Sequence, residues 1–216
     1  LYTKVVPDLT SRVTVPVLWD KQRETIVSNE SAEIIRMLNS AFNDITGNTD
    51  DYYPAGLRDE IDALNEWIYP TINNGVYRAG FATTQKAYEQ AFHQLFAALD
   101  ELEGRLSTRR YLTGAQITEA DWRLFTTLLR FDAVYFGHFK TNRQRLEDYA
   151  NISAYVRDLY QQPGIAATVD MPYIKQHYYG SHHTINPTGV VPLGPELDFD
   201  RPHNREALSG ESRSVA

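Results

Sequence analysis

Val13-Thr-Val-Pro-Val-Leu-Trp19 is followed, after a short polar turn, by Val27-Ser-Asn-Glu-Ser31, where an apolar-periodic segment begins. The first stretch is short and rich in β-branched residues, which predicts a buried strand over residues 13–18. Residues 25–28 predict a second strand directly after the turn. These two strands and the segment that follows them decide the fold of the first part of the chain.

A helix is predicted to follow the second strand, with Ser28 or Asn29 as its cap. Glu30 and Ser31 stand at its N-terminus, where first-turn N–H groups and the positive dipole end favour a carboxylate. Ser31 can donate to that carboxylate, and Glu30 can accept from an ammonium group of the same ligand. Capping alone is the alternative, and the preceding strand pair favours binding. The apolar residues of the helix are expected on one face: Ile34, Ile35, Leu38 and Phe42.

Composition excludes several classes of function. Among 216 residues, 21 Lys plus Arg against 28 Asp plus Glu give a net charge of −7, which argues against an electrostatic nucleic-acid binder. No apolar run approaches the roughly 18 residues of a membrane span. The chain has no cysteine and therefore no disulfide framework, so we expect a cytoplasmic location. The length allows one large or two small domains.

The rest of the chain has a helical pattern. We expect a first domain over residues 1–44, a polar linker over 45–56, an all-helical domain over 57–184 and an extended Pro/Gly-rich tail over 185–216, disordered from about residue 209. Apolar residues recur at the helical period from Leu57 to Ile72, although Pro70 is expected to kink or break that helix near Tyr69.

Two longer helices are expected further along the chain. The first runs from about Tyr88 to Leu106. The second, over residues 121–136, is apolar almost all round and belongs in the centre of a bundle. Thr118 and Asp121 in Ile117-Thr-Glu-Ala-Asp-Trp122 predict a capping box at its start, worth about 1 kcal/mol and structural in role.

Tyrosines and histidines are the remaining candidates for chemistry. Tyr77 and Tyr178 either pack their rings at helix ends or converge so that their hydroxyls donate to a thiolate or a substrate oxygen. Histidines cluster at positions 177, 182 and 183. They suggest a metal, but a catalytic zinc site requires a better-defined ligand set and a carboxylate partner. We therefore predict no metal.

The order strand, strand, helix resembles the second half of a thioredoxin-like domain, the half that binds glutathione in glutathione transferases. That resemblance makes Val15-Pro16 a predicted cis peptide. A cis-proline at this place turns the backbone of the preceding residue outward. Val15 would then make strand-like hydrogen bonds to the cysteine moiety of glutathione, beside Pro16.

Taken together, the motifs resemble the glutathionyl-hydroquinone reductases, the Xi class of glutathione transferases, from about Val5 to Pro195. The resemblance implies a glutathione transferase fold, mostly α, with a partial thioredoxin-like α/β domain followed by an all-α helical bundle. It is carried by Thr14-Val-Pro-Val-Leu-Trp-Asp20, Ser28-Asn-Glu-Ser-Ala-Glu-Ile-Ile-Arg36, Asn73-Asn-Gly-Val-Tyr-Arg-Ala-Gly-Phe81, Asp121-Trp-Arg-Leu and Ser181-His-His-Thr-Ile-Asn-Pro187.

The same resemblance implies an activity. Such enzymes reduce glutathionyl-hydroquinones to hydroquinone and oxidised glutathione, through a low-pKa cysteine that forms a mixed disulfide with glutathione. Val15, Pro16, Glu30 and Ser31 would bind glutathione as co-substrate. Tyr77 and Tyr178 would be the catalytic tyrosines of the hydroquinone pocket. The protein would be a homodimer without nucleic-acid or membrane partners.

One departure from the family is large. The family's Cys-Pro-Trp-Ala segment lies upstream of the region represented here, and no cysteine replaces it. We therefore expect the intact protein to be a cysteine-dependent reductase and these 216 residues alone to be inactive. Two alternatives stay open: a conventional glutathione-conjugating transferase, and a non-catalytic glutathione-binding or dimerisation module.

Overall fold

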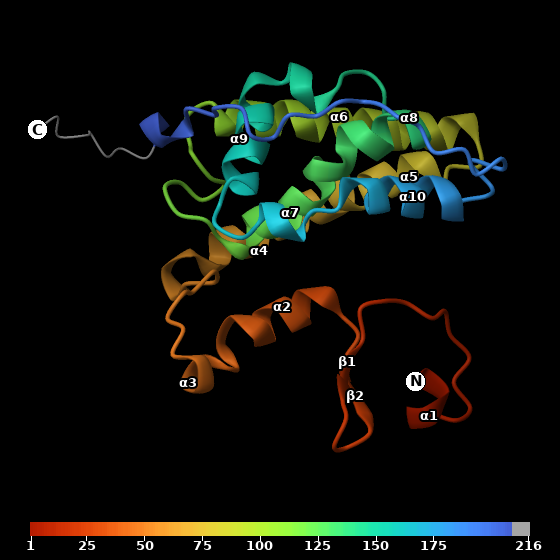
Figure 1. Ribbon diagram of the computed structural model, residues 1–216, viewed down its shortest axis with the longest axis vertical. Coiled ribbons are helices and arrows are strands. Elements are labelled where there is room, and N and C mark those ends of the chain that lie inside the picture. Colours follow the sequence, from red (N-terminus) through yellow and green to blue (C-terminus); the bar gives the residue numbers. More distant parts are fainter. Residues whose placement is uncertain (209–216) are drawn as a thin grey trace, which may run out of the picture. The chain divides into compact units, whose positions relative to one another are not determined.

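The computed structural model describes residues 1–208, so the disorder predicted from residue 209 lies outside the described residues. The chain divides into two compact units, Leu1–Ala55 and a second that begins at Gly56 (Figure 1). Within the described residues, no helix has both the length and the apolar character needed to cross a bilayer.

Unit 1 is built around one antiparallel strand pair. Trp19 pairs with Ile26 and Asp20 with Thr25, and a register irregularity separates Leu18 from Trp19. The Asp20 carboxylate accepts hydrogen bonds from the backbone N–H groups of the turn residues Gln22 and Arg23, at 2.8 and 2.9 Å. The elements of this unit are α1 (Tyr2–Val5), β1 (Leu18–Asp20), β2 (Thr25–Ser28), α2 (Ser31–Ser40) and α3 (Asn43–Thr46).

The strand predicted over residues 13–18 begins only at Leu18, and the prediction of burial was wrong. Val13 and Val15 are 80% and 87% exposed. Only Leu18–Asp20 have partners on β2, and Pro16 has no N–H to donate to a ladder. The Val15-Pro16 peptide bond is cis, as predicted.

Helix α2 also begins and ends differently from the prediction. Its N-cap is Glu30, whose carboxylate accepts from the Ala32 N–H at 3.4 Å. The Ser28 hydroxyl instead donates to Glu33 at 2.8 Å and accepts from the Glu30 N–H. Because the helix ends at Ser40, Phe42 lies outside it and is 51% exposed.

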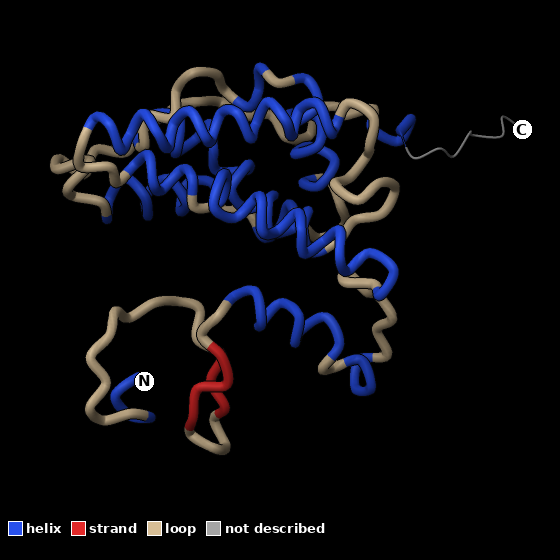
Figure 2. Tube along the Cα trace, turned by 180° about the vertical axis from the view of Figure 1, so that it is seen from behind, coloured by secondary structure: helices blue, strands red, loops and turns tan. Residues whose placement is uncertain are grey.

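Unit 2 is a stack of helices (Figure 2), which confirms the predicted mostly helical architecture. A 3-10 turn, η1 (Ala55–Leu57), stands at the boundary between the units. The following elements are α4 (Arg58–Ile68), η2 (Tyr69–Asn73), α5 (Gly75–Gly80), α6 (Gln85–Leu106), α7 (Glu119–Arg130), η3 (Phe131–Tyr135), α8 (Phe136–His138), η4 (Leu146–Asp148), α9 (Ala150–Tyr160), η5 (Ala166–Thr168), α10 (Met171–Ser181) and η6 (Arg205–Leu208).

Two π-helical turns shape the core of unit 2. Pro70 ends α4 at Ile68 as predicted, and the chain continues through η2, where the Asn74 N–H donates to Tyr69 O at 2.8 Å. A second π-helical segment, η3, continues α7. An extra residue in a helical turn rotates the side chains beyond it. These turns set the orientation of α5 and of the end of η3.

The chain after α10 runs extended along the helices of unit 2 (Figure 1). The ammonium group of Lys175, only 9% exposed, donates to the carbonyl oxygens of Leu193 and Gly194 at 2.6 and 3.0 Å. The buried guanidinium of Arg205 donates to Leu106 O at 3.1 Å and Arg110 O at 2.8 Å. This segment is therefore held by hydrogen bonds to α10 and to the last residue of α6.

Candidate functional site

Unit 1 brings the predicted glutathione-binding residues into neighbouring segments. Asn29 donates from its side-chain amide to Pro16 O at 2.7 Å, which ties the cis-proline turn to the start of α2. The exposed backbone of Val15 is therefore close in structure to the exposed Glu30 and Ser31. An exposed backbone beside a helix N-terminus suits a peptide with a free carboxylate.

Unit 2 brings Tyr77 and Tyr178 together from α5 and α10, 101 residues apart. Their hydroxyl oxygens are 2.5 Å apart. A third tyrosine, Tyr135 at the end of η3, lies with its hydroxyl 2.9 Å from that of Tyr178. We call these three residues the tyrosine cluster. The convergence of Tyr77 and Tyr178 was predicted, and the participation of Tyr135 was not.

The rings of the tyrosine cluster pack against Phe139, which is fully buried. The Phe139 ring centroid lies 5.4 Å from those of Tyr77 and Tyr135, and it is stacked on Tyr135 at an interplanar angle of 15°. Phe81 adds a further ring at 5.3 Å from Phe139. Aromatic contacts at these distances fix ring orientation as well as burying area, so the three hydroxyls have little freedom to separate.

Burial keeps the inner hydroxyls protonated. Tyr135 is 2% exposed and Tyr178 is 8% exposed, whereas Tyr77 is half-buried. Burial raises the pKa of both Tyr135 and Tyr178 above the ordinary value for tyrosine. At neutral pH Tyr135 and Tyr178 are therefore neutral phenols, which can donate hydrogen bonds.

Two histidines of unit 2, His138 and His182, lie within hydrogen-bonding distance of each other. His182 Nδ1 lies 3.1 Å from Nε2 of His138, a residue that the sequence interpretation left out. His177 contributes a ring contact to His182, with centroids 6.5 Å apart. Among the residues that the structure describes, no group of three His, Cys, Asp or Glu is arranged to hold a metal ion.

Acidification is expected to destabilise the fold through His138. Burial lowers its pKa to about 4, below the ordinary value of 6.5, and burial also lowers the pKa of His182. The unfolded chain therefore binds protons that the folded chain does not. The contribution of the neutral His138 ring to the free energy of unfolding is complete above pH 6.5 and is lost as the pH falls toward 4.

We expect His138→Gln to reduce the drop in urea midpoint between pH 7.5 and pH 5, whereas exposed His93→Gln leaves it unchanged. An equal drop in His138→Gln and the wild type would contradict this account.

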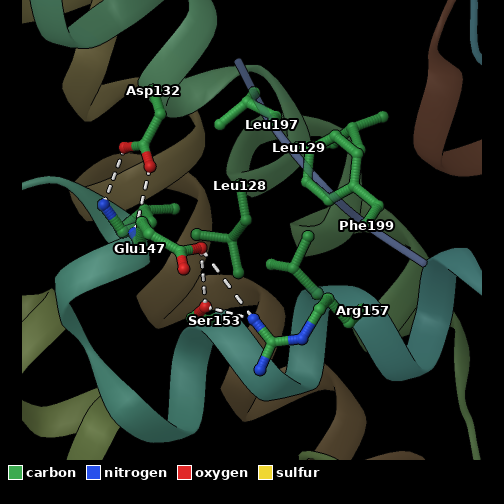
Figure 3. A pocket seen from close by; sticks show the side chains of 10 residues that line it. Leu128, Leu129, Asp132, Glu147, Ser153, Arg157, Leu197 and Phe199 are labelled. Atoms are coloured by element: carbon green, nitrogen blue, oxygen red, sulfur yellow. Dashed lines mark hydrogen bonds and ion pairs between the residues drawn. The ribbon is translucent and has the colours of Figure 1, made fainter. Parts of the chain in front are cut away.

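A separate small cavity between α7, η3 and α9 does not serve this chemistry (Figure 3). Leu197 and Phe199 of the extended segment cover it, and Asp132 accepts hydrogen bonds at its edge from the N–H groups of Leu146 and Glu147. Its volume of about 20 Å³ holds one water molecule. A cavity of this size is too small for glutathione or a hydroquinone.

Comparison with known proteins identifies the family of this fold. Residues 85–158 match the family described as glutathione S-transferase, C-terminal domain. A solved structure of glutathione transferase Xi 1 from Trametes versicolor superposes with a TM-score of 0.87 at 53% identity, covering 90% of this chain and 68% of that one. The fold is therefore the glutathione transferase fold, with a partial thioredoxin-like unit and a helical unit.

Two relatives carry a more specific name. Glutathionyl-hydroquinone reductase YqjG of Escherichia coli is 56% identical over 210 residues, 97% of this chain, and its glutathione-bound structure superposes with a TM-score of 0.92 over 95% of this chain and 67% of that one. Glutathionyl-hydroquinone reductase PcpF of Sphingobium chlorophenolicum is 55% identical over 195 residues, 90% of this chain. The chain belongs to the Xi class of glutathione transferases.

The chain spans 64% of the length of the Escherichia coli relative and 62% of the Sphingobium relative. Its own sequence contains no cysteine. The activity of the whole protein is therefore a matter of proposal.

Proposed function

We propose that the chain acts in a glutathione-dependent reductase of glutathionyl-hydroquinones. The observation that carries this proposal is the tyrosine cluster, in which Tyr77 and Tyr178 meet at 2.5 Å beside the rings of Phe81 and Phe139. Phenol donors beside the partly exposed ring of Phe81 suit a planar ligand that carries oxygen atoms. The names of two relatives at 56% and 55% identity support the same substrate class.

Each unit supplies its own candidate binding residues, and the two sets are proposed separately. In unit 1, the Val15 backbone beside Pro16 pairs with the cysteinyl part of glutathione, and Ser31 and Glu30 bind its γ-glutamyl end. In unit 2, Tyr77 and Tyr178 stabilise oxygen on the aromatic part. A thiolate attacks the thioether sulfur, and the electron pair of the broken carbon–sulfur bond leaves with the aromatic group, which takes up a proton. Donors to its oxygen lower the barrier to that step.

The thiolate has to come from a cysteine outside these 216 residues, which contain none. A second glutathione then resolves the mixed disulfide and leaves as oxidised glutathione. In this proposal the protein is a cytoplasmic homodimer and uses no metal. Residues 1–44 form its glutathione-binding domain, 45–56 the linker, 57–184 the helical domain and 185–216 the tail.

Turnover separates the proposal from its alternatives. The chain alone is expected to release no hydroquinone, and the chain fused to a preceding segment with the family's Cys-Pro-Trp-Ala motif is expected to release it from a glutathionyl-hydroquinone. Release by the chain alone would contradict a cysteine mechanism. Conjugation of a model chloroarene would indicate a conventional transferase. Glutathione binding with an inactive fusion would indicate a binding module.

Tyr77→Phe is expected to lower kcat/KM of that fusion by roughly 10- to 100-fold, because the substitution removes a donor to developing charge. Glutathione binding to the chain, measured by calorimetry, is expected to stay near wild type. Glu30→Gln and Ser31→Ala are the complementary variants, because both are expected to weaken glutathione binding. Unchanged kcat/KM in Tyr77→Phe would remove this tyrosine from the mechanism.

A further inference from the structure

The tyrosine cluster contains three hydroxyl protons and two hydrogen-bonding contacts. Tyr178 is the middle member, 2.5 Å from Tyr77 and 2.9 Å from Tyr135. Each hydroxyl can donate one hydrogen bond and accept two. Two protons therefore occupy the two contacts, and the third has to point out of the cluster.

Burial decides which proton points outward. If Tyr77 donated to Tyr178 and Tyr178 to Tyr135, the outward proton would belong to Tyr135, which is 2% exposed. If both outer tyrosines donated to Tyr178, the proton of Tyr178, 8% exposed, would have no acceptor within the cluster. An unsatisfied buried donor is costly. Only the order Tyr135 to Tyr178 to Tyr77 leaves the free proton on Tyr77, the half-buried member of the cluster.

We propose that Tyr135 and Tyr178 are positioning residues that donate in series and so direct the hydroxyl proton of Tyr77 at the oxygen of a phenolate-class ligand. The inference rests on the proposed function, in which that ligand is the hydroquinone. It refines the proposed function, in which Tyr77 and Tyr178 both stabilise the ligand oxygen: Tyr77 touches the ligand, Tyr178 acts through Tyr77, and Tyr135 acts through Tyr178.

The surroundings favour this order. Burial raises the pKa of Tyr135 and Tyr178, so both keep the protons that the series requires. Phe139 stacks on Tyr135 and fixes its ring. A hydroxyl that accepts a hydrogen bond becomes a better donor, so each step strengthens the next.

The first test needs no ligand. The 216-residue chain is labelled with 13C at the ζ carbon of tyrosine, whose chemical shift responds to hydrogen bonding of the hydroxyl. Tyr135→Phe keeps the ring and removes one hydroxyl, and we expect it to move the resonances of both Tyr178 and Tyr77. Tyr111→Phe is the matched control, because Tyr111 is also buried but bonds to Asp158 at 3.2 Å. A Tyr77 resonance that stays in place in Tyr135→Phe would overturn the series.

The second test adds 4-nitrophenol as the probe, whose phenolate absorbs separately from the phenol. The wild-type chain is expected to bind the phenolate more tightly than the phenol. Tyr135→Phe should reduce that preference about threefold through the loss of one cooperative hydrogen bond. Tyr77→Phe should abolish it, and Tyr111→Phe should leave it unchanged. Equal preferences in Tyr135→Phe and the wild type would overturn the role of Tyr135.

The two tests distinguish a failure of the hydrogen-bond series from a failure of the proposed function. Coupled resonances without binding of the probe would reject the aromatic pocket of the proposed function and leave the hydrogen-bond series intact. Binding of the phenolate without coupled resonances would reject the series and leave the pocket intact. A urea midpoint near that of the wild type confirms that Tyr135→Phe is folded in either case.

Discussion

Replacement of Asp121 by alanine is expected to lower the free energy of unfolding by about 3–5 kcal/mol, the range for breaking a buried polar network. The carboxylate is fully buried at the start of α7. It accepts hydrogen bonds from the N–H groups of Leu112 and Thr118 at 2.9 and 2.8 Å, from the Thr118 hydroxyl at 3.0 Å and from the Tyr155 hydroxyl at 2.8 Å. Alanine leaves these four donors buried without an acceptor.

The stability lost in Asp121→Ala is expected to be smaller than the sum of four independent hydrogen bonds. Burial raises the pKa of Asp121, which means that burying the charge already costs free energy in the wild type. Alanine removes that cost along with the bonds. Urea unfolding followed by circular dichroism measures the net effect as a shift in midpoint at constant slope.

Asp148→Ala is the control for loss of a carboxylate. Asp148 pairs with Arg145 at 2.7 Å on the surface, where both side chains are nearly half exposed. We expect little change in the free energy of unfolding there, because solvent screens the exposed ion pair. If Asp121→Ala were as mild as this control, the four hydrogen bonds would not stabilise the fold.

The same network shows how far sequence reasoning reaches. The capping box of Thr118 and Asp121 was predicted from a spacing of three residues and is confirmed. The other partners of Asp121 were not predictable, because Leu112 precedes it by nine residues and Tyr155 follows it by 34. Local motifs reveal local bonds, and long-range partners depend on packing.

The tyrosine cluster repeats this lesson at the candidate site. Tyr77 and Tyr178 were predicted to converge because of the family resemblance, since nothing in their spacing brings α5 to α10. Tyr135 lay inside a segment interpreted as uniformly apolar core. The signal that points to it is physical: a buried tyrosine hydroxyl requires a partner.

The strand prediction failed for a related reason. The β-branched residues of 13–17 satisfy the pattern of a strand. Strand structure also requires a partner for the backbone, and in the described residues only Leu18–Asp20 have one.

Gly80→Ala is expected to destabilise unit 2 by about 3 kcal/mol, at the upper end for overpacking. Gly80 is the last residue of α5. A methyl group there would lie 2.2 Å from Cγ and 2.7 Å from Cβ of Phe139. These atoms are near the root of the side chain and cannot swing aside. Phe139 is also fully buried, and its ring contacts Tyr77 and Tyr135.

The substitution is therefore expected to disturb the tyrosine cluster as well as the fold. If Phe139 is displaced, Tyr77 and Tyr135 lose the ring that orients them, and near-UV circular dichroism should change even where the protein remains folded. Phe139→Ala removes Cγ and Cδ1, two of the three atoms that the added methyl group would meet. Gly80→Ala should therefore cost less stability in the Phe139→Ala background than in the wild type. A smaller cost there would show that the two positions are coupled through direct contact.

Gly104→Ala is the matched control for adding a methyl group to a helix. Gly104 lies in α6, and a Cβ there would meet no atom within 4 Å. Alanine in a helix is favoured over glycine by roughly 0.5–1 kcal/mol, so this variant should be slightly more stable than the wild type. Opposite signs at Gly80 and Gly104 would separate the packing effect from helix propensity. A gain in stability at both positions would mean that Phe139 can move, and that the tyrosine cluster is less firmly held than its ring contacts indicate.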